Sequence, residues 1–123
     1  MLLLESYWER MDLNIPIYFS AGLAQKANDY YKFFVNWCNE SVRNELLEDE
    51  RNVFDFPHIR PWNFMATHNE TPCVLLATTG MLHAGTSLQV FKEWCSEKKN
   101  LVVLPGYCVE NTIGGQVLAG DML

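Results

Sequence analysis

Three short segments of this 123-residue chain combine a glycine with hydroxyl-bearing or aromatic side chains. They are Ser20-Ala21-Gly22, Thr78-Thr79-Gly80 and Gly106-Tyr107, and each follows an apolar run with the composition of a buried strand. Glycine allows close backbone approach to a ligand, and the start of a following helix offers free N–H groups and a positive dipole end. We therefore predict a weak phosphate or RNA site, with an ordinary strand-to-helix connection as the alternative. Its candidate residues are Ser20, Thr78, Thr79, Gly80, Gly106 and Tyr107.

The histidines give no metal-binding pattern. His58, His68 and His83 lie in separate segments, and no two are two to four residues apart. We expect His83, beside the Thr-Thr-Gly loop, to be a hydrogen-bonded structural residue. A pair of Cys95 with His83 stays an open alternative that nothing favours over burial of Cys95. We predict no catalytic residue, no metal ligand and no cofactor site within this chain.

Composition predicts one folded, acidic domain. The chain is 49% hydrophobic and 13% aromatic, and its formal net charge is −6. Binding along a phosphate backbone needs Lys and Arg to replace counterions, so the charge opposes general nucleic-acid binding but allows a local site made from backbone N–H groups. The apolar start at residues 1–4 stops at Glu5 without a basic flank, which excludes a signal peptide, and no apolar run is long enough to cross a membrane.

The four cysteines form no C-x-x-C pair. Each lies in an apolar or amphipathic context, so we expect reduced thiols, at least three of them buried, rather than disulfides or a zinc knuckle. They are Cys38, Cys73, Cys95 and Cys108.

The elements that would position the glycine loops alternate between strands and helices. Periodicity predicts helices over 2–11, 23–34, 38–50, 87–95 and from Asn111 or Thr112 to 118. Apolar composition predicts strands over 15–19, 73–77 and 101–104, and a short aromatic strand around Phe54 and Phe56 within 52–59, with 60–72 mostly loop. Two apolar helix faces should turn inward: Leu23, Ala27, Tyr30, Tyr31 and Phe34 on one helix, and Leu88, Phe91 and Cys95 on another.

This alternation is typical of βαβ units. The predicted fold class is α/β, with three layers and a mainly parallel sheet that carries helices on both faces. Right-handed crossovers would place the strand exits at one edge of the sheet, where open α/β sheets bind ligands. The three glycine loops should therefore lie together.

Four blocks of sequence carry a family resemblance: 14–23, 56–59, 77–85 and 105–110. In order and spacing they resemble the Rossmann-like β-CASP domain of metallo-β-lactamase-fold RNA endonucleases. The blocks around Tyr18 and Met81 are most similar to the Integrator branch, with the cleavage and polyadenylation factor branch as close paralogue. Two positions depart from the family pattern: Thr79 stands where proline is usual, and Asn111 stands where glycine is usual. Asn111 could adopt a left-handed conformation or cap the last helix.

The resemblance implies that residues 1–123 are a β-CASP domain inserted in a larger hydrolase. Two zinc ions would be held by histidines and aspartates of a separate metallo-β-lactamase domain, whose H-x-H-x-D-H segment is absent here. The domain would cap that site and form one wall of the RNA channel, and would be inactive alone. Because Met1 falls in a predicted helix and Leu123 closely follows one, both ends are expected to be internal boundaries.

The same resemblance implies partners and a location. Partners would be the metallo-β-lactamase domain of the same protein, RNA, and other subunits of an RNA-processing complex, without a membrane. The location would be the nucleus, with the cytoplasm also possible. An exposed apolar patch is expected where the other domain would meet this one. The alternative from a different class is a free-standing α/β module that binds a nucleotide or a protein without catalysis.

Overall fold

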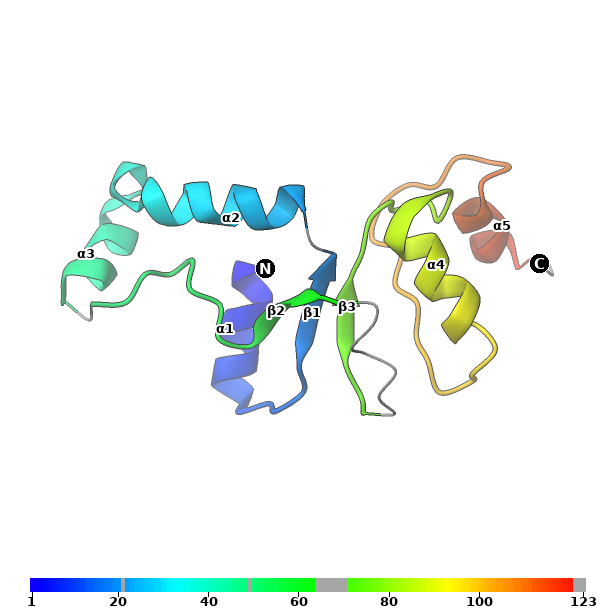
Figure 1. Cartoon of the computed structure of the whole chain (residues 1–123), viewed down its shortest axis with the longest axis horizontal. Coiled ribbons are helices and arrows are strands. Elements are labelled where there is room, and N and C mark those ends of the chain that lie inside the picture. The colour runs from blue at the N-terminus through cyan, green and yellow to red at the C-terminus, as the bar shows by residue number, and fades with distance from the viewer. Residues whose placement is uncertain (21, 49, 64–70, 121–123) are drawn as a thin grey trace. The chain divides into compact units, whose positions relative to one another are not determined.

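The computed structural model describes residues 1–20, 22–48, 50–63 and 71–120. The chain divides into two compact units, Met1–Leu76 and Ala77–Leu123, each of which is described by itself. The first unit contains α1 (Leu2–Met11), β1 (Ile17–Ser20), α2 (Leu23–Phe33), the 3-10 helix η1 (Val35–Trp37), α3 (Glu40–Glu48), β2 (Ile59–Trp62) and β3 (Val74–Leu76) (Figure 1). The second contains α4 (Gly85–Trp94) and α5 (Ile113–Ala119).

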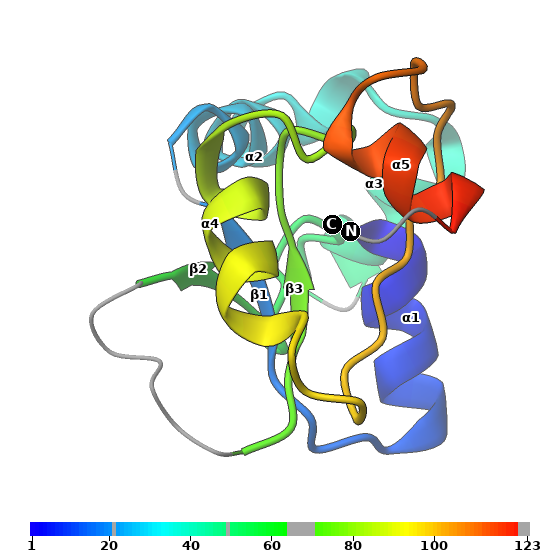
Figure 2. The same cartoon turned by 90° about the vertical axis from the view of Figure 1, so that its right-hand side faces the viewer.

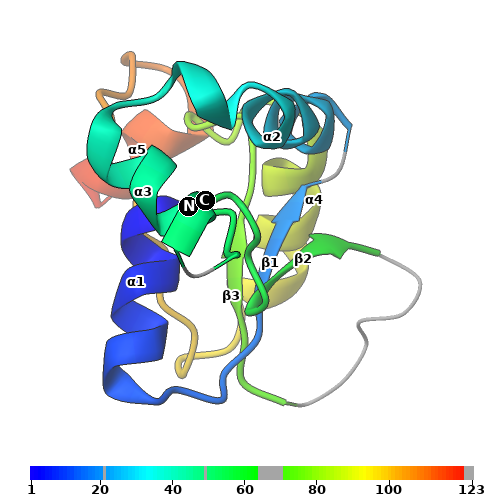
Figure 3. The same cartoon turned by 90° about the vertical axis from the view of Figure 1, so that its left-hand side faces the viewer.

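The sheet of the first unit is parallel, with strand order β2-β1-β3 (Figure 3). Ile17 of β1 pairs with Ile59 on one side and with Val74 on the other. Pro61 opposes Phe19 from the edge strand β2, where a missing N–H donor is tolerated. Parallel pairing requires helical or looped crossovers, which α2, η1 and α3 supply between β1 and β2.

A small apolar core joins α1 to this sheet. Trp8, Ile17, Phe19 and Ile59 form its buried centre. The indole N–H of Trp8 donates to the carbonyl of Ile15 at 2.7 Å, so its polar atom is satisfied while its ring is buried. The spacing of Leu4 and Trp8, which predicted a helix with one apolar face, therefore places both side chains against the start of β1.

The short strand predicted around Phe54 and Phe56 is wrong. Asn52 makes a turn there, because its Oδ1 accepts the N–H of Phe54 at 3.1 Å and its carbonyl accepts that of Asp55 at 2.8 Å. Phe54 is buried from this turn rather than from a strand. The strand begins at Ile59 and runs through Trp62, inside a segment predicted to be mostly loop.

In the second unit, α4 buries a different face from the predicted one. Ser87 and Val90 are its buried residues, whereas Leu88 and Phe91 are half-buried and Cys95 is exposed. The helix begins at Gly85, and the Ser87 hydroxyl donates to the carbonyl of Thr79 at 2.6 Å, which satisfies this polar side chain inside the unit. The hydrophobic periodicity could not anticipate a buried serine.

The predicted strand at 101–104 is also wrong. The segment joins α4 to α5 without strand pairing in the described residues, and Leu101 and Val103 are exposed (Figure 2). An apolar β-branched run becomes a strand only where a neighbouring strand supplies ladder hydrogen bonds. The α/β class and the parallel sheet are nevertheless confirmed, with five α-helices and three strands in the described part of the chain.

Candidate functional site

The loop that follows β3 is held closed by its own backbone. The carbonyl of Thr78 accepts the N–H of Ser87 at 3.0 Å, and the carbonyl of Thr79 accepts the N–H of Leu82 at 3.2 Å. Leu82 is buried and has a φ of 56°, in the left-handed region. One of the first N–H groups of α4 is thus already used within the loop and is not free for an anion.

The hydroxyl of Thr79 also has an internal partner. Its Oγ1 donates to the carbonyl of Ala84 at 3.3 Å and lies 3.3 Å from Nδ1 of His83. The expectation that His83 makes a structural hydrogen bond is consistent with this contact. Thr78 is exposed, and in the described part of the chain its hydroxyl has no hydrogen-bond partner. Of the two predicted hydroxyl donors, only that of Thr78 is open to a ligand.

Cys108 and Gly114 bring this loop together with the segment that follows 101–104. The Cys108 thiol lies 3.9 Å from the Gly80 carbonyl and 4.0 Å from the Gly106 carbonyl. The N–H of Gly114 donates to the carbonyl of Met81 at 2.9 Å. A Cβ at Gly114 would lie 2.9 Å from that same carbonyl oxygen, so only glycine fits without a shift. Gly80 and Gly106 are thereby neighbours, as predicted for two of the three loops.

The start of α5 resolves the alternatives left open for Asn111. Asn111 has a φ of 67° and takes the left-handed turn, whereas Thr112 caps the helix. The Thr112 hydroxyl accepts the N–H of Gly115 at 3.1 Å and donates to the carbonyl of Val109 at 2.7 Å. The N–H groups of both Gly114 and Gly115 are therefore satisfied internally.

Fewer groups at this site are free to contact a ligand than the sequence predicted. The N–H groups of Gly114 and Gly115 and the Thr79 hydroxyl have partners, so none of these three supplies a free donor. The backbone at Gly80 and Gly106 and the ring of Tyr107, which is 81% exposed, are accessible. Such a site could contact a phosphate through the backbone and stack a base on Tyr107.

Ser20 is the last residue of β1 and is half-buried in the first unit. Ser20 belongs to the first unit, whereas Thr78 and Gly106 belong to the second, so the grouping of these three residues stays a prediction. Gly22 begins α2 with a φ of 108°, a conformation that suits glycine at this strand exit.

The histidines make no metal centre in the described residues, where no three side chains of His, Cys, Asp or Glu gather around one point. His58 contacts buried Glu5, whose Oε1 lies 2.5 Å from Nδ1 of the imidazole and accepts the His58 N–H at 3.4 Å. His68 lies outside the described residues. His83 and Cys95 flank opposite ends of α4, about 15 Å of helix apart, so they form no catalytic pair.

The expectation of at least three buried cysteines is wrong. All four thiols are free, but only Cys108 is buried, whereas Cys38 and Cys73 are half-buried and Cys95 is exposed. Cys95 follows the last residue of α4 and stays on the face of Leu88 and Phe91, but that face borders an open groove, so the thiol is exposed. Burial raises the pKa of the Cys73 thiol above its ordinary value of 9.0.

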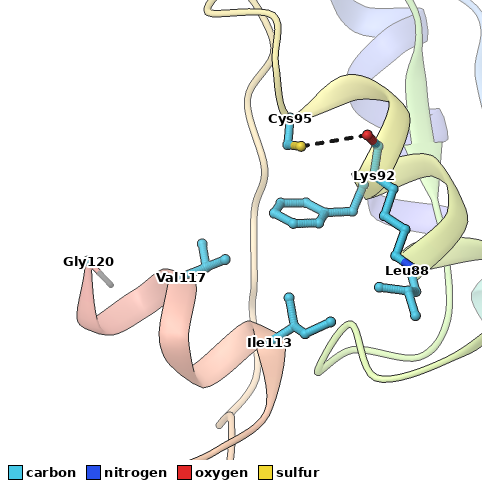
Figure 4. A pocket seen from close by; sticks show the side chains of 7 residues that line it. Leu88, Lys92, Cys95, Ile113, Val117 and Gly120 are labelled. Carbon is cyan, nitrogen blue, oxygen red and sulfur yellow. Dashed lines mark hydrogen bonds between the residues drawn. The ribbon is translucent and has the colours of Figure 1, made fainter. Parts of the chain in front are cut away.

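An open apolar groove of about 500 Å³ lies between α4 and α5 (Figure 4). Leu88 and Phe91 line one side, and Ile113 and Val117 line the other. Periodicity placed Leu88 and Phe91 on an inward face. Within this unit the side chains of the two sides face each other across the groove and bury only part of their surface.

Sequence reasoning overlooked Cys108 and Gly114 as the residues that join the two glycine loops. Cys108 looked like an ordinary core thiol. The available signal was the Gly114-Gly115 pair at the start of a helix, where glycine is costly and therefore indicates close approach of another backbone.

Comparison with known proteins matches residues 1–117 to the model of the Beta-Casp domain family. The chain belongs to the Beta-Casp domain family. The domain is 50% identical over 120 residues to Integrator complex subunit 11 of Danio rerio, covering 98% of this chain and 20% of that protein. It is 51% identical over 118 residues to the Integrator complex subunit 11 homolog of Dictyostelium discoideum, covering 95% and 16%.

A similarity of 46% over 119 residues extends to cleavage and polyadenylation specificity factor subunit 3-II of Arabidopsis thaliana, covering 97% of this chain and 19% of that protein. The resemblance to both the Integrator and the polyadenylation branches is therefore confirmed. This Beta-Casp chain spans about a fifth of the length of these relatives. Among the described residues, no helix combines the length and apolarity needed to cross a membrane.

Proposed function

We propose that this Beta-Casp domain, residues 1–123, is the inserted cap domain of a zinc-dependent endonuclease. That enzyme would process RNA 3′ ends in the nucleus. The observation that carries the proposal is the similarity over nearly the whole chain to subunits of the Integrator complex and of the cleavage and polyadenylation factor. In this proposal the domain forms one wall of the RNA channel. Its partners are the metallo-β-lactamase domain, RNA and other subunits of such a complex.

The geometry of the second unit supports a backbone contact with RNA. Gly80 and Gly106 are close together through Cys108, and neither has a side chain that would keep a phosphate away. Tyr107 stands exposed next to Gly106 and offers a face on which a base can stack. Thr78 adds an open hydroxyl, and Ser20 would join the same path in the proposed arrangement. Because no Lys or Arg is in this constellation, the contact should be weak and should position RNA rather than supply most of the affinity.

The described residues of this chain contain no set of side chains that could hold a catalytic metal ion. They gather no set of three possible ligands, so they do not fit a zinc centre, and no step of the reaction is assigned to them. The two zinc ions of the proposal would be held outside the Beta-Casp domain. What this domain would contribute is shape, exclusion of water and contacts with the RNA backbone.

The test uses the native protein and a fluorescent RNA that carries a 3′-processing site. Cleavage should require metal and stop with a chelator. Tyr107→Ala should raise KM for RNA about fivefold or more with little change in kcat, because one stacked base contributes about 1–3 kcal/mol. Leu47→Ala is the matched control, because Leu47 is an exposed apolar side chain of the first unit and should leave KM unchanged.

Each outcome has a defined meaning. Metal-independent cleavage, or no cleavage of any RNA by the native protein, overturns the endonuclease proposal and favours the binding module without catalysis. Cleavage with an unchanged KM for Tyr107→Ala keeps the enzyme but removes the loop site. An NMR titration of this chain with phosphate and oligouridylate then locates the contact, with shifts expected at Gly80, Gly106 and Thr78.

A further inference from the structure

Four aromatic side chains at the end of α2 share one exposed face. Tyr30, Phe33, Phe34 and Trp37 are 67%, 77%, 46% and 86% exposed. Tyr30, Phe33 and Phe34 have the spacing i, i+3 and i+4 at the end of α2, and the ring contact of Phe34 with Trp37 extends the set into η1. Figure 1 shows the end of α2, from which this set arises. We call this set the aromatic stripe. Clusters of large exposed aromatic side chains are more common at protein interaction surfaces than on the rest of a protein's surface.

The stripe is held in shape by its own contacts. The ring of Phe34 lies edge-to-face with Phe33 at 5.0 Å and with Trp37 at 6.4 Å between centroids. The N–H of Trp37 donates to the Phe34 carbonyl at 2.9 Å, which fixes η1. Such a surface loses little side-chain entropy on binding.

The opposite side of the same helix anchors it. Val35, on the adjoining η1, is buried, and the ring of Tyr31, although 60% exposed, stacks on buried Phe54 at 5.3 Å. Asn28 adds a hydrogen bond from its Nδ2 to the Phe54 carbonyl at 3.2 Å. Turning the stripe inward would break these contacts, so its exposure follows from how α2 is attached to the unit.

Charges near the stripe distinguish the possible occupants. The helix α3, which contacts η1, carries three carboxylates, Glu40, Glu45 and Glu48, and one cation, Arg43, so its net charge is negative. None of these carboxylates forms an ion pair with any residue that the structure describes. Lys32, the cation closest in sequence to the stripe, is paired with Asp55 at 2.6 Å.

Single-stranded RNA stacks on aromatics only where cations follow its backbone, and unpaired carboxylates repel it. A second copy of this chain that bound through the same surface would place its own α3 carboxylates against those of the first copy, and the two sets would repel each other. A protein surface with an apolar centre and a basic rim complements both the stripe and α3. The i, i+3, i+4 spacing of Tyr30, Phe33 and Phe34 is that of a helix whose anchors enter an apolar groove, and Trp37 extends this set from η1.

We propose that the aromatic stripe docks into an apolar groove, rimmed by Lys or Arg, on another protein. Trp37 and Phe33 are the anchors, and the α3 carboxylates orient the partner and increase its association rate. This surface belongs to the first unit and involves none of the residues of the proposed RNA contact. Its success or failure is therefore independent of the proposed cleavage activity.

The test places the photo-crosslinking amino acid p-benzoylphenylalanine at Phe33 in the native protein in cells. Leu101, an exposed apolar residue of the second unit, serves as the control position. Crosslinked peptides are sequenced, and the partner that they identify is purified for binding measurements. The expected peptide from Phe33 combines apolar residues with neighbouring Lys or Arg and is absent from the Leu101 control.

Binding measurements with that partner then test both parts of the proposal. Trp37→Ser should weaken binding about 30-fold, as for a hot-spot aromatic, whereas Leu101→Ser, at an exposed apolar residue of the second unit, should change it less than about 3-fold. Replacing the three α3 carboxylates (Glu40→Gln, Glu45→Gln, Glu48→Gln) should weaken binding and flatten its salt dependence. Melting curves confirm that these exposed substitutions leave the fold intact.

Several results would overturn the proposal that the aromatic stripe docks into a basic-rimmed groove on another protein. Crosslinks from Phe33 to RNA, to a second copy or to another segment of the same protein each identify a different occupant. No crosslink at all means that the stripe has no partner. A captured protein whose affinity is unchanged by Trp37→Ser, or whose contacting peptide is acidic, contradicts the docking mode.

Discussion

Gly114 is the residue on which the arrangement of the second unit depends most directly. A methyl group there would lie 2.9 Å from the Met81 carbonyl oxygen, 3.1 Å from the Met81 carbonyl carbon and 2.9 Å from the Cys108 thiol. Two of these three atoms are backbone and cannot rotate away. Relief therefore requires α5 to move from the loop, which also lengthens the bond from the Gly114 N–H to Met81.

The size of the effect follows from two opposing terms. Overpacking a close contact costs about 1–3 kcal/mol. Alanine offsets part of this, since it favours helix by about 0.5–1 kcal/mol over glycine. Gly114→Ala should therefore destabilise the second unit by about 1–2 kcal/mol. If the chain unfolds in one step, this lowers Tm by about 4–8 °C.

Thermal unfolding followed by circular dichroism measures this loss, and hydrogen exchange of the loop peptide locates it. In Gly114→Ala the amides of Leu82 and Ser87 should exchange faster, because the loop loses its contact with α5. Gly80→Ala is the matched control, since no atom lies within 4 Å of a Cβ built there. The reasoning is refuted if Gly114→Ala melts with the wild type, or if Gly80→Ala is destabilised equally.

Three further predictions concern stability and thiol reactivity. Thr112→Ala removes the cap of α5 and should cost about 1 kcal/mol in urea unfolding; an unchanged midpoint contradicts the cap. Glu5→Ala removes a buried acceptor and should cost about 2 kcal/mol, whereas Glu9→Ala, at a surface ion pair, should cost about 0.5 kcal/mol or less; equal losses would show that burial of Glu5 is unimportant. In the native protein iodoacetamide should label exposed Cys95 before Cys73, since burial raises the Cys73 pKa and only the thiolate reacts; the reverse order refutes this. Because the pKa of Cys73 is higher in the folded state, the contribution of this thiol to the free energy of unfolding is fully present below pH 9.0. It is lost as the pH rises through the pKa of the folded state.

Local patterns determined a large part of this protein. The helices were predicted because apolar residues recur at helical spacing, as Leu4 and Trp8 do in α1. Two strands were predicted because short apolar runs end at glycine or polar turns, which is how β1 and β3 end. The family resemblance rested on ordered blocks such as 77–85, and the match over residues 1–117 agrees with it.

Only tertiary structure decided which of these surfaces are buried. Tyr30 and Phe34 have the spacing of a buried helix face, yet they are exposed because α2 attaches through Tyr31 and η1 through Val35. The run at 101–104 has strand composition but no paired neighbour in the described residues. Periodicity reports which residues share a face, whereas burial depends on what lies opposite that face.

The same distinction applies to the candidate site. Sequence predicted free donors at Thr79 and at the helix starts, because hydroxyls and helix N-termini usually have spare N–H or O–H groups. The folded structure uses several of these donors, through the carbonyls of Ala84, Thr78 and Met81. Hydrogen-bond partners that are distant in sequence cannot be read from residue types alone. The sequence therefore identified the glycine loops, and tertiary structure decided that Gly80, Gly106 and Tyr107 are the parts left open.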